Sequence, residues 1–90
     1  MSRYEDIREK ILSGNSDNNV SETEMRFFLS KIGAKHKRTK GSHIICRIDG
    51  VPRLINIQPI NGKIKAYQVK QIRNIVREYG IGKGGGFDGV

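Results

Sequence analysis

The sequence has a single cysteine, no long apolar run and few acidic residues after position 30, and each shortage excludes a class of protein. One thiol cannot form an internal disulfide, and Cys46 lies in an apolar run, so we expect a buried, reduced thiol. No apolar stretch approaches the roughly 20 residues that span a bilayer. The N-terminal residues MSRYED lack an apolar signal core, so we expect a cytoplasmic protein without a membrane partner.

Basic residues are in excess, and they are unevenly distributed. The 90 residues carry 17 Lys and Arg against 9 Asp and Glu, a net charge of +8. Residues 1–30 hold four basic and six acidic side chains, a net charge of −2, whereas residues 31–90 hold thirteen and three, a net charge of +10. A small domain with this surplus attracts polyanions, of which nucleic acid is the commonest in the cytosol. An acidic protein partner is the alternative.

The N-terminal residues predict a short helix followed by a polar linker. Ser2-x-x-Glu5 has the form of a capping box, and apolar residues at helical spacing continue over residues 4–12. Gly14 is suited to end this helix, and residues 15–19, NSDNN, are typical of a linker rich in turns. Because the helix is short and carries few apolar residues, we expect it to need a surface on which to pack.

Two further helices carry stronger apolar stripes. One follows the capping box Ser21-x-x-Glu24 and ends at Gly33, and the other covers residues 66–79 and ends at Gly80. The stripes, which we expect to face the core, are Met25, Phe28, Leu29 and Ile32 in the earlier helix and Val69, Ile72, Ile75, Val76 and Tyr79 in the later one. The cations that lie mostly off the last stripe are Lys70, Arg73 and Arg77.

Three strands are predicted between these two helices. They cover residues 34–39, which are polar, residues 42–48, which are mainly apolar, and residues 51–58. Lys40-Gly41 is expected to form the tight turn between the first two strands. Asp49-Gly50 is typical of a two-residue hairpin turn between the second and the third, and Pro59 ends the sheet.

This order of elements predicts a small α+β domain with one additional helix at its N-terminus. Two helices then cover one face of a three-stranded antiparallel sheet and leave the other face open. Alternation along the second strand directs Ser42, Ile44, Cys46 and Ile48 toward the helices and His43, Ile45 and Arg47 toward the open face. His43 therefore follows the turn at Gly41 and lies beside the cationic first strand.

His43 is the candidate for chemistry because imidazole titrates near neutral pH. Cleavage of RNA by its own 2′-hydroxyl requires removal of a proton there and stabilisation of charge on the phosphate, and a histidine among cations can do part of both. The cations suited to hold the phosphates are Lys37, Arg38, Lys40 and Arg47. On spacing alone, a solvated or phosphate-contacting histidine stays open. No spacing typical of metal ligands is present, so we expect neither metal nor cofactor.

The stretch over residues 28–81 resembles the HicA family of bacterial toxins. The matching pieces are the helix end LSKIG at residues 29–33, the basic strand leading into KGSH at residues 40–43, a hairpin with the strand LINIQP at residues 54–59, and the helix VKQIRNIVREYGI at residues 69–81. They occur in this chain in the same order as in the family.

The resemblance implies a double-stranded-RNA-binding-domain-like fold, α-β-β-β-α. It also implies a cytoplasmic bacterial toxin of a toxin–antitoxin system, a hydrolase that cuts mRNA without a ribosome or a metal. Such a toxin is neutralised by a cognate HicB-type antitoxin, with which it forms a hetero-oligomer and which covers the active site. The family's catalytic histidine follows Gly-Ser, and in this chain that residue is His43.

The chain departs from the family internally and at both ends. Many members have a second histidine after the first, where this chain has Ile44, a residue expected to face the core. Residues 1–20 form an N-terminal helical extension and linker, with three possible roles: extending the core, self-association or altered antitoxin contact. The HicA-like domain is expected over residues 21–81, and residues 82–90 are expected to form a glycine-rich, disordered tail. A phosphate-binding loop is rejected there, because no strand and helix flank the glycines.

Two other functions stay open at this point. A non-catalytic RNA-binding module of the same fold would read duplex shape through phosphate and 2′-hydroxyl contacts. A protein-interaction domain would use the basic face for an acidic partner and would show no affinity for RNA at moderate salt.

Overall fold

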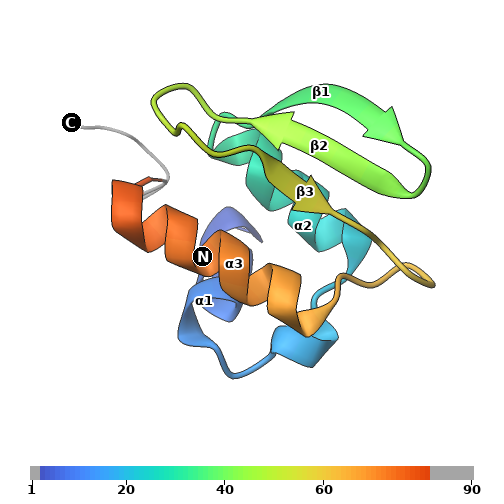
Figure 1. The fold of residues 1–90 in the computed structure, drawn as a ribbon. Helices are drawn as coiled ribbons and strands as arrows, with labels where there is room; N and C mark the ends of the chain where they lie inside the picture. Colours follow the sequence, from blue (N-terminus) through green and yellow to red (C-terminus); the bar gives the residue numbers. More distant parts are fainter. Residues whose placement is uncertain (1–2, 82–90) are drawn as a thin grey trace.

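The computed structural model describes residues 3–81, and this part of the chain forms three α-helices and one three-stranded antiparallel sheet. In chain order the elements are α1 (Arg3–Ser13), η1 (Asp17–Asn19, a 3₁₀ turn), α2 (Glu22–Lys31), β1 (Lys35–Lys40), β2 (His43–Arg47), β3 (Ile55–Ile57) and α3 (Ala66–Tyr79). Figure 1 shows the sheet as one layer with the α-helices on one side of it. The predicted α+β class and order of elements are confirmed. Two predictions, the Ser2 cap and the tail over residues 82–90, lie outside the described residues.

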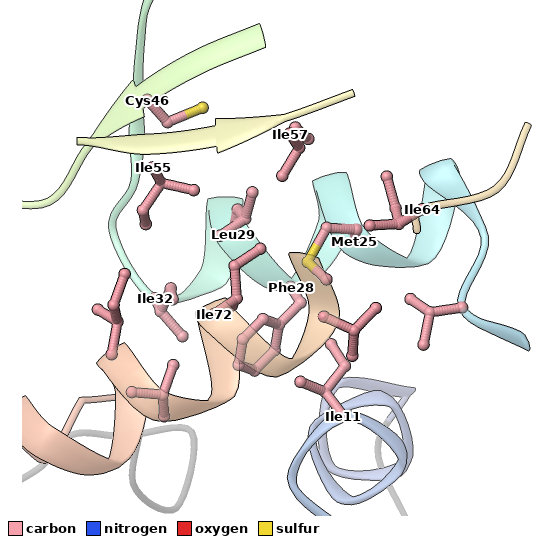
Figure 2. Packing of buried hydrophobic residues seen from close by; sticks show 14 of the residues in the cluster. Ile11, Met25, Phe28, Leu29, Ile32, Cys46, Ile55, Ile57, Ile64 and Ile72 are labelled. Atoms are coloured by element: carbon pink, nitrogen blue, oxygen red, sulfur yellow. The ribbon is translucent and has the colours of Figure 1, made fainter. Parts of the chain in front are cut away.

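The core lies between the sheet and the helices, as the apolar stripes predict. Figure 2 shows Leu29 of α2 and Ile72 of α3 beneath Ile55 and Ile57 of β3. The largest side chains with almost no exposed area are Phe28, Ile11, Met25, Ile57, Ile72, Val20 and Val69. Burial of this kind contributes about 2 kcal/mol per large aliphatic side chain, so these contacts fix how the helices cover the sheet.

The predicted caps of α2 and α3 are present. The Ser21 hydroxyl accepts a hydrogen bond from the backbone N–H of Glu24 at 3.0 Å, and the Glu24 carboxylate accepts one from the backbone N–H of Ser21 at 3.0 Å. Gly33 and Gly80, with φ of +90° and +61°, occupy the left-handed region that ends each helix. None of the helices within residues 3–81 is long and apolar enough to cross a bilayer.

The N-terminal helix α1 is part of the same core, which is one of the three roles left open for it. The Tyr4 ring lies parallel to the Phe28 ring of α2, with centroids 6.0 Å apart. Ile11 has no exposed area, and Lys10 Nζ donates to Glu24 Oε1 at 2.9 Å. The surface that this weakly apolar helix needs is therefore supplied by α2 and α3.

Arg73 is buried, although it lies off the apolar stripe of α3. Its guanidinium donates to both carboxylate oxygens of Asp17, at 2.8 and 3.1 Å, and to the Ile11 carbonyl at 3.1 Å. A Cβ at Gly14 would lie 3.5 Å from the same guanidinium. The linker after α1 thus folds around Arg73, and the ion pair explains a burial that apolar periodicity did not predict.

The strands differ from the prediction at their ends. Lys40 pairs with His43, so the two-residue turn is Gly41-Ser42 and not Lys40-Gly41, and β2 begins at His43. Gly41 has a φ of +62°, which glycine adopts without steric cost at the first position of such a turn.

The third strand is shorter than predicted and begins four residues later. Val51 is buried in the core, and its N–H bonds the Ile48 carbonyl in a turn around Gly50. The chain therefore turns into the core at Val51 before β3 begins, and β2 and β3 are joined by a loop and not by a two-residue hairpin. Pro52 has no N–H for the ladder, which agrees with its place in this loop.

Candidate functional site

The open face of the sheet gathers most of the predicted site residues. The register pairs Lys40 with His43, and partners in an antiparallel ladder direct their side chains to the same face. The other pairs on this face are Arg38 with Ile45 and Lys35 with Arg47. All six residues of β1 are exposed. His43, Arg38, Lys40 and Arg47 therefore share one surface, which we call the basic face together with Lys35.

Lys37 is the predicted site residue that the register does not place on the basic face. The ladder shifts between His36 and Arg38, which leaves Lys37 as the extra residue of a β-bulge without a partner on β2. Alternation alone would have put Lys37 and Arg38 on opposite faces. The bulge reverses the alternation that precedes it, so Lys35 and not His36 shares the face of Arg38, Lys40 and His43.

Sequence reasoning missed Asn56, which contacts His43. The Nδ1 atom of His43 lies 3.0 Å from Oδ1 of Asn56 on β3. Because an amide oxygen only accepts hydrogen bonds, Nδ1 is the donor in this contact, and in the neutral imidazole Nε2 is then the acceptor. Alternation of Ile55, Asn56 and Ile57 signals that Asn56 faces away from the core, but the contact also needs the register between β2 and β3, which a single sequence does not give.

The floor of the basic face is apolar at its centre. Ile45 is buried, yet it is not a member of the core cluster on the helix side of the sheet. Its neighbours in the ladder are Arg38 on β1 and Asn56 on β3. The exposed cations of the basic face therefore flank an apolar side chain at its centre.

Ser42 does not face the helices as predicted, because it belongs to the turn. It is exposed, and its hydroxyl accepts a hydrogen bond from Gln58 Nε2 at 3.1 Å. The backbone N–H of Gln58 donates to Oε1 of the buried Gln68, at 2.8 Å. These contacts connect the turn before His43, the end of β3 and the first turn of α3.

The second histidine lies on the other side of the sheet. His36 pairs with Cys46, whose side chain is in the core, and His36 Nε2 lies 2.8 Å from the Thr39 hydroxyl. A small cavity of about 130 Å³ near these residues is bordered by Arg26 of α2. Burial raises the pKa of the Cys46 thiol, and Arg26 opposes this only in part. The thiol is therefore buried as predicted and protonated at neutral pH.

A larger cavity of about 470 Å³ lies between β3 and α3. Its lining includes the buried Ile55, Ile72 and Ile75 together with polar and charged side chains, among them Gln71 and Asn74. Asn56 also belongs to its wall, so the cavity adjoins the partner of His43.

Within residues 3–81, no three His, Cys, Asp or Glu side chains come together as metal ligands would.

The cations of the basic face are free to bind an anion. Lys35 is 3.6 Å from Asp49, but both side chains are more than three-quarters exposed, so this ion pair contributes little. Arg38, Lys40 and Arg47 form no ion pair with any described residue.

No family model, no curated protein and no solved structure matches the chain.

Proposed function

We propose that the protein is a HicA-type toxin of a type II toxin–antitoxin system. It is an endoribonuclease that cuts mRNA in the bacterial cytoplasm without a ribosome or a metal, and its α+β fold is of the double-stranded-RNA-binding-domain-like type. The observation that supports this best is the contact between His43 and Asn56, on a face that also carries Arg38, Lys40 and Arg47, none of which forms an ion pair with a described residue.

The proposed reaction uses the 2′-hydroxyl of the RNA as nucleophile. His43 Nε2 removes its proton, the 2′-oxygen forms a bond to phosphorus, and the bond from phosphorus to the 5′-oxygen breaks. The products are a 2′,3′-cyclic phosphate and a 5′-hydroxyl, and the proton on His43 is available to the departing oxygen. Lys40, which pairs with His43 in the ladder, and Arg38 stabilise the negative charge that develops on the phosphate.

The proposed antitoxin is an HicB-type protein that covers the basic face. The net charge of +8 favours an acidic surface on that partner, and covering the unpaired cations would exclude RNA from His43. A toxin held in such a hetero-oligomer is inactive until the partner is removed.

Inducible expression in a bacterial host tests this function. The wild type is expected to arrest growth and to fragment mRNA, while His43→Ala leaves growth and mRNA intact. His36→Ala is the matched control, because it removes the imidazole of the opposite face, and it is expected to remain toxic. Full toxicity of His43→Ala would contradict the proposal, and loss of purified activity in EDTA would contradict metal independence.

A non-catalytic RNA-binding module is the second candidate, and one observation favours it. His36 lies on the other face, so His43 is the only imidazole on the basic face and must serve both proton transfers. A binding module needs only the cations. It predicts salt-sensitive RNA binding without cleavage, unchanged by His43→Ala.

A further inference from the structure

An exposed tyrosine in the first turn of α3 has no role in the fold or in the site described above. Tyr67 is 57% exposed, more than the other large exposed apolar side chains of the described residues, Leu54 and Ile60. The ammonium group of Lys65 lies 5.8 Å from the centroid of its ring. An aromatic ring open to solvent beside a cation has the two components with which proteins hold unpaired nucleotides, a stacking surface and a partner for phosphate.

The chain segment that carries Tyr67 has charge of one sign. No Asp or Glu occurs between Gly50 and Arg77 in the sequence. Lys63, Lys65 and Lys70 lie in this segment, and none of them forms an ion pair within residues 3–81. Lys70 follows Tyr67 by three positions, so the two are neighbours on the surface of α3. The ring therefore lies in a segment of unpaired cations. Such a segment attracts an anionic ligand more strongly than it attracts a neutral or basic protein surface.

Hydrogen bonds connect the start of α3, where Tyr67 lies, to the turn that precedes His43. The turn at Gly41-Ser42 is hydrogen-bonded to Gln58, and Gln58 is hydrogen-bonded to Gln68, the residue after Tyr67. The type I′ turn at Asn61-Gly62, in which Ile60 and Lys63 exchange two hydrogen bonds, leads from β3 to α3. In Figure 1 this turn and the turn before β2 project toward the same side of the molecule.

We propose that Tyr67 is a stacking platform for an unpaired base of single-stranded RNA, with Lys63, Lys65 and Lys70 holding the adjacent phosphates. A base within a duplex has both faces covered by its neighbours, so the ring accepts only a base that is not stacked in a helix. Resting on the proposed function, this subsite binds a nucleotide that flanks the phosphodiester cut at His43, and it makes the substrate a single-stranded region of mRNA.

Binding of a 2′-O-methyl oligoadenylate by the wild type tests the subsite, because the blocked 2′-oxygen prevents cleavage of the probe. With 2-aminopurine at one position, the fluorescence of that base reports stacking directly. Tyr67→Ala is expected to weaken binding about tenfold and to abolish the fluorescence change, whereas Tyr67→Phe, which keeps the ring, retains both. Leu54→Ala, which removes another exposed apolar side chain, is the control and is expected to bind as the wild type does.

The outcomes separate the subsite from the proposed function. Equal binding by Tyr67→Ala and the wild type, or an equal loss in Tyr67→Phe, overturns the subsite even if His43-dependent cleavage is observed. If Tyr67→Ala weakens binding of a duplex of the same length as much as it weakens binding of the single strand, the assignment to single strands is overturned. If the wild type binds neither RNA, as expected of a patch that docks a protein, the subsite itself is overturned. Tyr67-dependent binding by a protein that cleaves nothing supports the subsite and contradicts the nuclease.

Discussion

At the scale of single residues, the contact with Asn56 orients the imidazole of His43. A histidine without a partner would sample several orientations and both tautomers, whereas the Asn56 amide oxygen accepts from Nδ1 and so favours, in the neutral imidazole, the tautomer with the acceptor at Nε2. Lys40 and Arg38 supply positive charge on the same face, and because both are donors only they cannot accept the Nδ1–H hydrogen bond that Asn56 accepts. Asn56 acts on the proposed chemistry through His43, and is therefore a positioning residue.

Replacing Asn56 by aspartate tests this role. A carboxylate in place of the amide favours the protonated imidazole, so the acid limb of the pH profile of RNA cleavage is expected to move to higher pH by about one unit. Asn56→Ala is expected to lower kcat without that displacement, because it removes the orienting contact and adds no charge. An unchanged profile in Asn56→Asp would show that Asn56 does not act on His43.

Arg73 is the residue on which the packing of the linker depends most. Arg73→Ala leaves the Asp17 carboxylate and the Ile11 carbonyl without their donor, and we expect a loss of about 3 kcal/mol in the free energy of unfolding. Arg26→Ala removes an exposed pair with Glu22 and should cost about 0.5 kcal/mol or less. Urea denaturation of both variants measures the difference, and equal costs would contradict the account of Arg73.

At the scale of elements, the helices were predictable and the strand ends were not. The capping box at Ser21 and the stripe of α2 use contacts within a few residues, which a sequence displays directly. The turn at Gly41-Ser42 and the late start of β3 depend on pairing between strands and on Val51 entering the core. Those are tertiary contacts, and they override local preference.

The cap of α2 can be tested against a serine in a similar position that caps nothing. Ser21→Ala removes the acceptor for the backbone N–H of Glu24 and should lower the free energy of unfolding by about 1 kcal/mol. Ser16 precedes η1 but makes no capping hydrogen bond through its side chain, so Ser16→Ala should cost about 0.5 kcal/mol or less. A cost for Ser16→Ala equal to that of Ser21→Ala would mean that the capping contact contributes nothing specific.

At the scale of the whole molecule, α1 and its linker are joined to the rest by burial and by charge. The sequence indicated that α1 needs a surface, but it did not indicate which one, since Lys10 meets Glu24 and Asp17 meets Arg73 across 14 and 56 positions. The open face was predictable from alternation on β2. Its composition was only partly so, because the bulge at Lys37 and the contact of Asn56 depend on register.

The ion pair between Lys10 of α1 and Glu24 of α2 predicts that the stability of the fold decreases in acid. Burial by itself would raise the pKa of Glu24, but hydrogen bonds from Ser21 and Lys10 outweigh it, and the pKa is lowered from its ordinary value of 4.5. A lowered pKa means that this carboxylate stabilises the fold above about pH 4.5 and that the contribution is lost as the pH falls through the folded value. The difference in urea stability between the wild type and Glu24→Gln should therefore shrink on acidification, and a constant difference would contradict the assignment.

Cleavage of a single-stranded RNA by purified protein in EDTA tests the central claim most directly. Wild type and His36→Ala are expected to cut the RNA and to leave 2′,3′-cyclic phosphate ends. His43→Ala, with the same urea unfolding midpoint as the wild type, is expected to cut none. Cleavage by His43→Ala at the wild-type rate, or an intact RNA after incubation with the wild type, would contradict the assignment of His43 as the catalytic residue of an endoribonuclease.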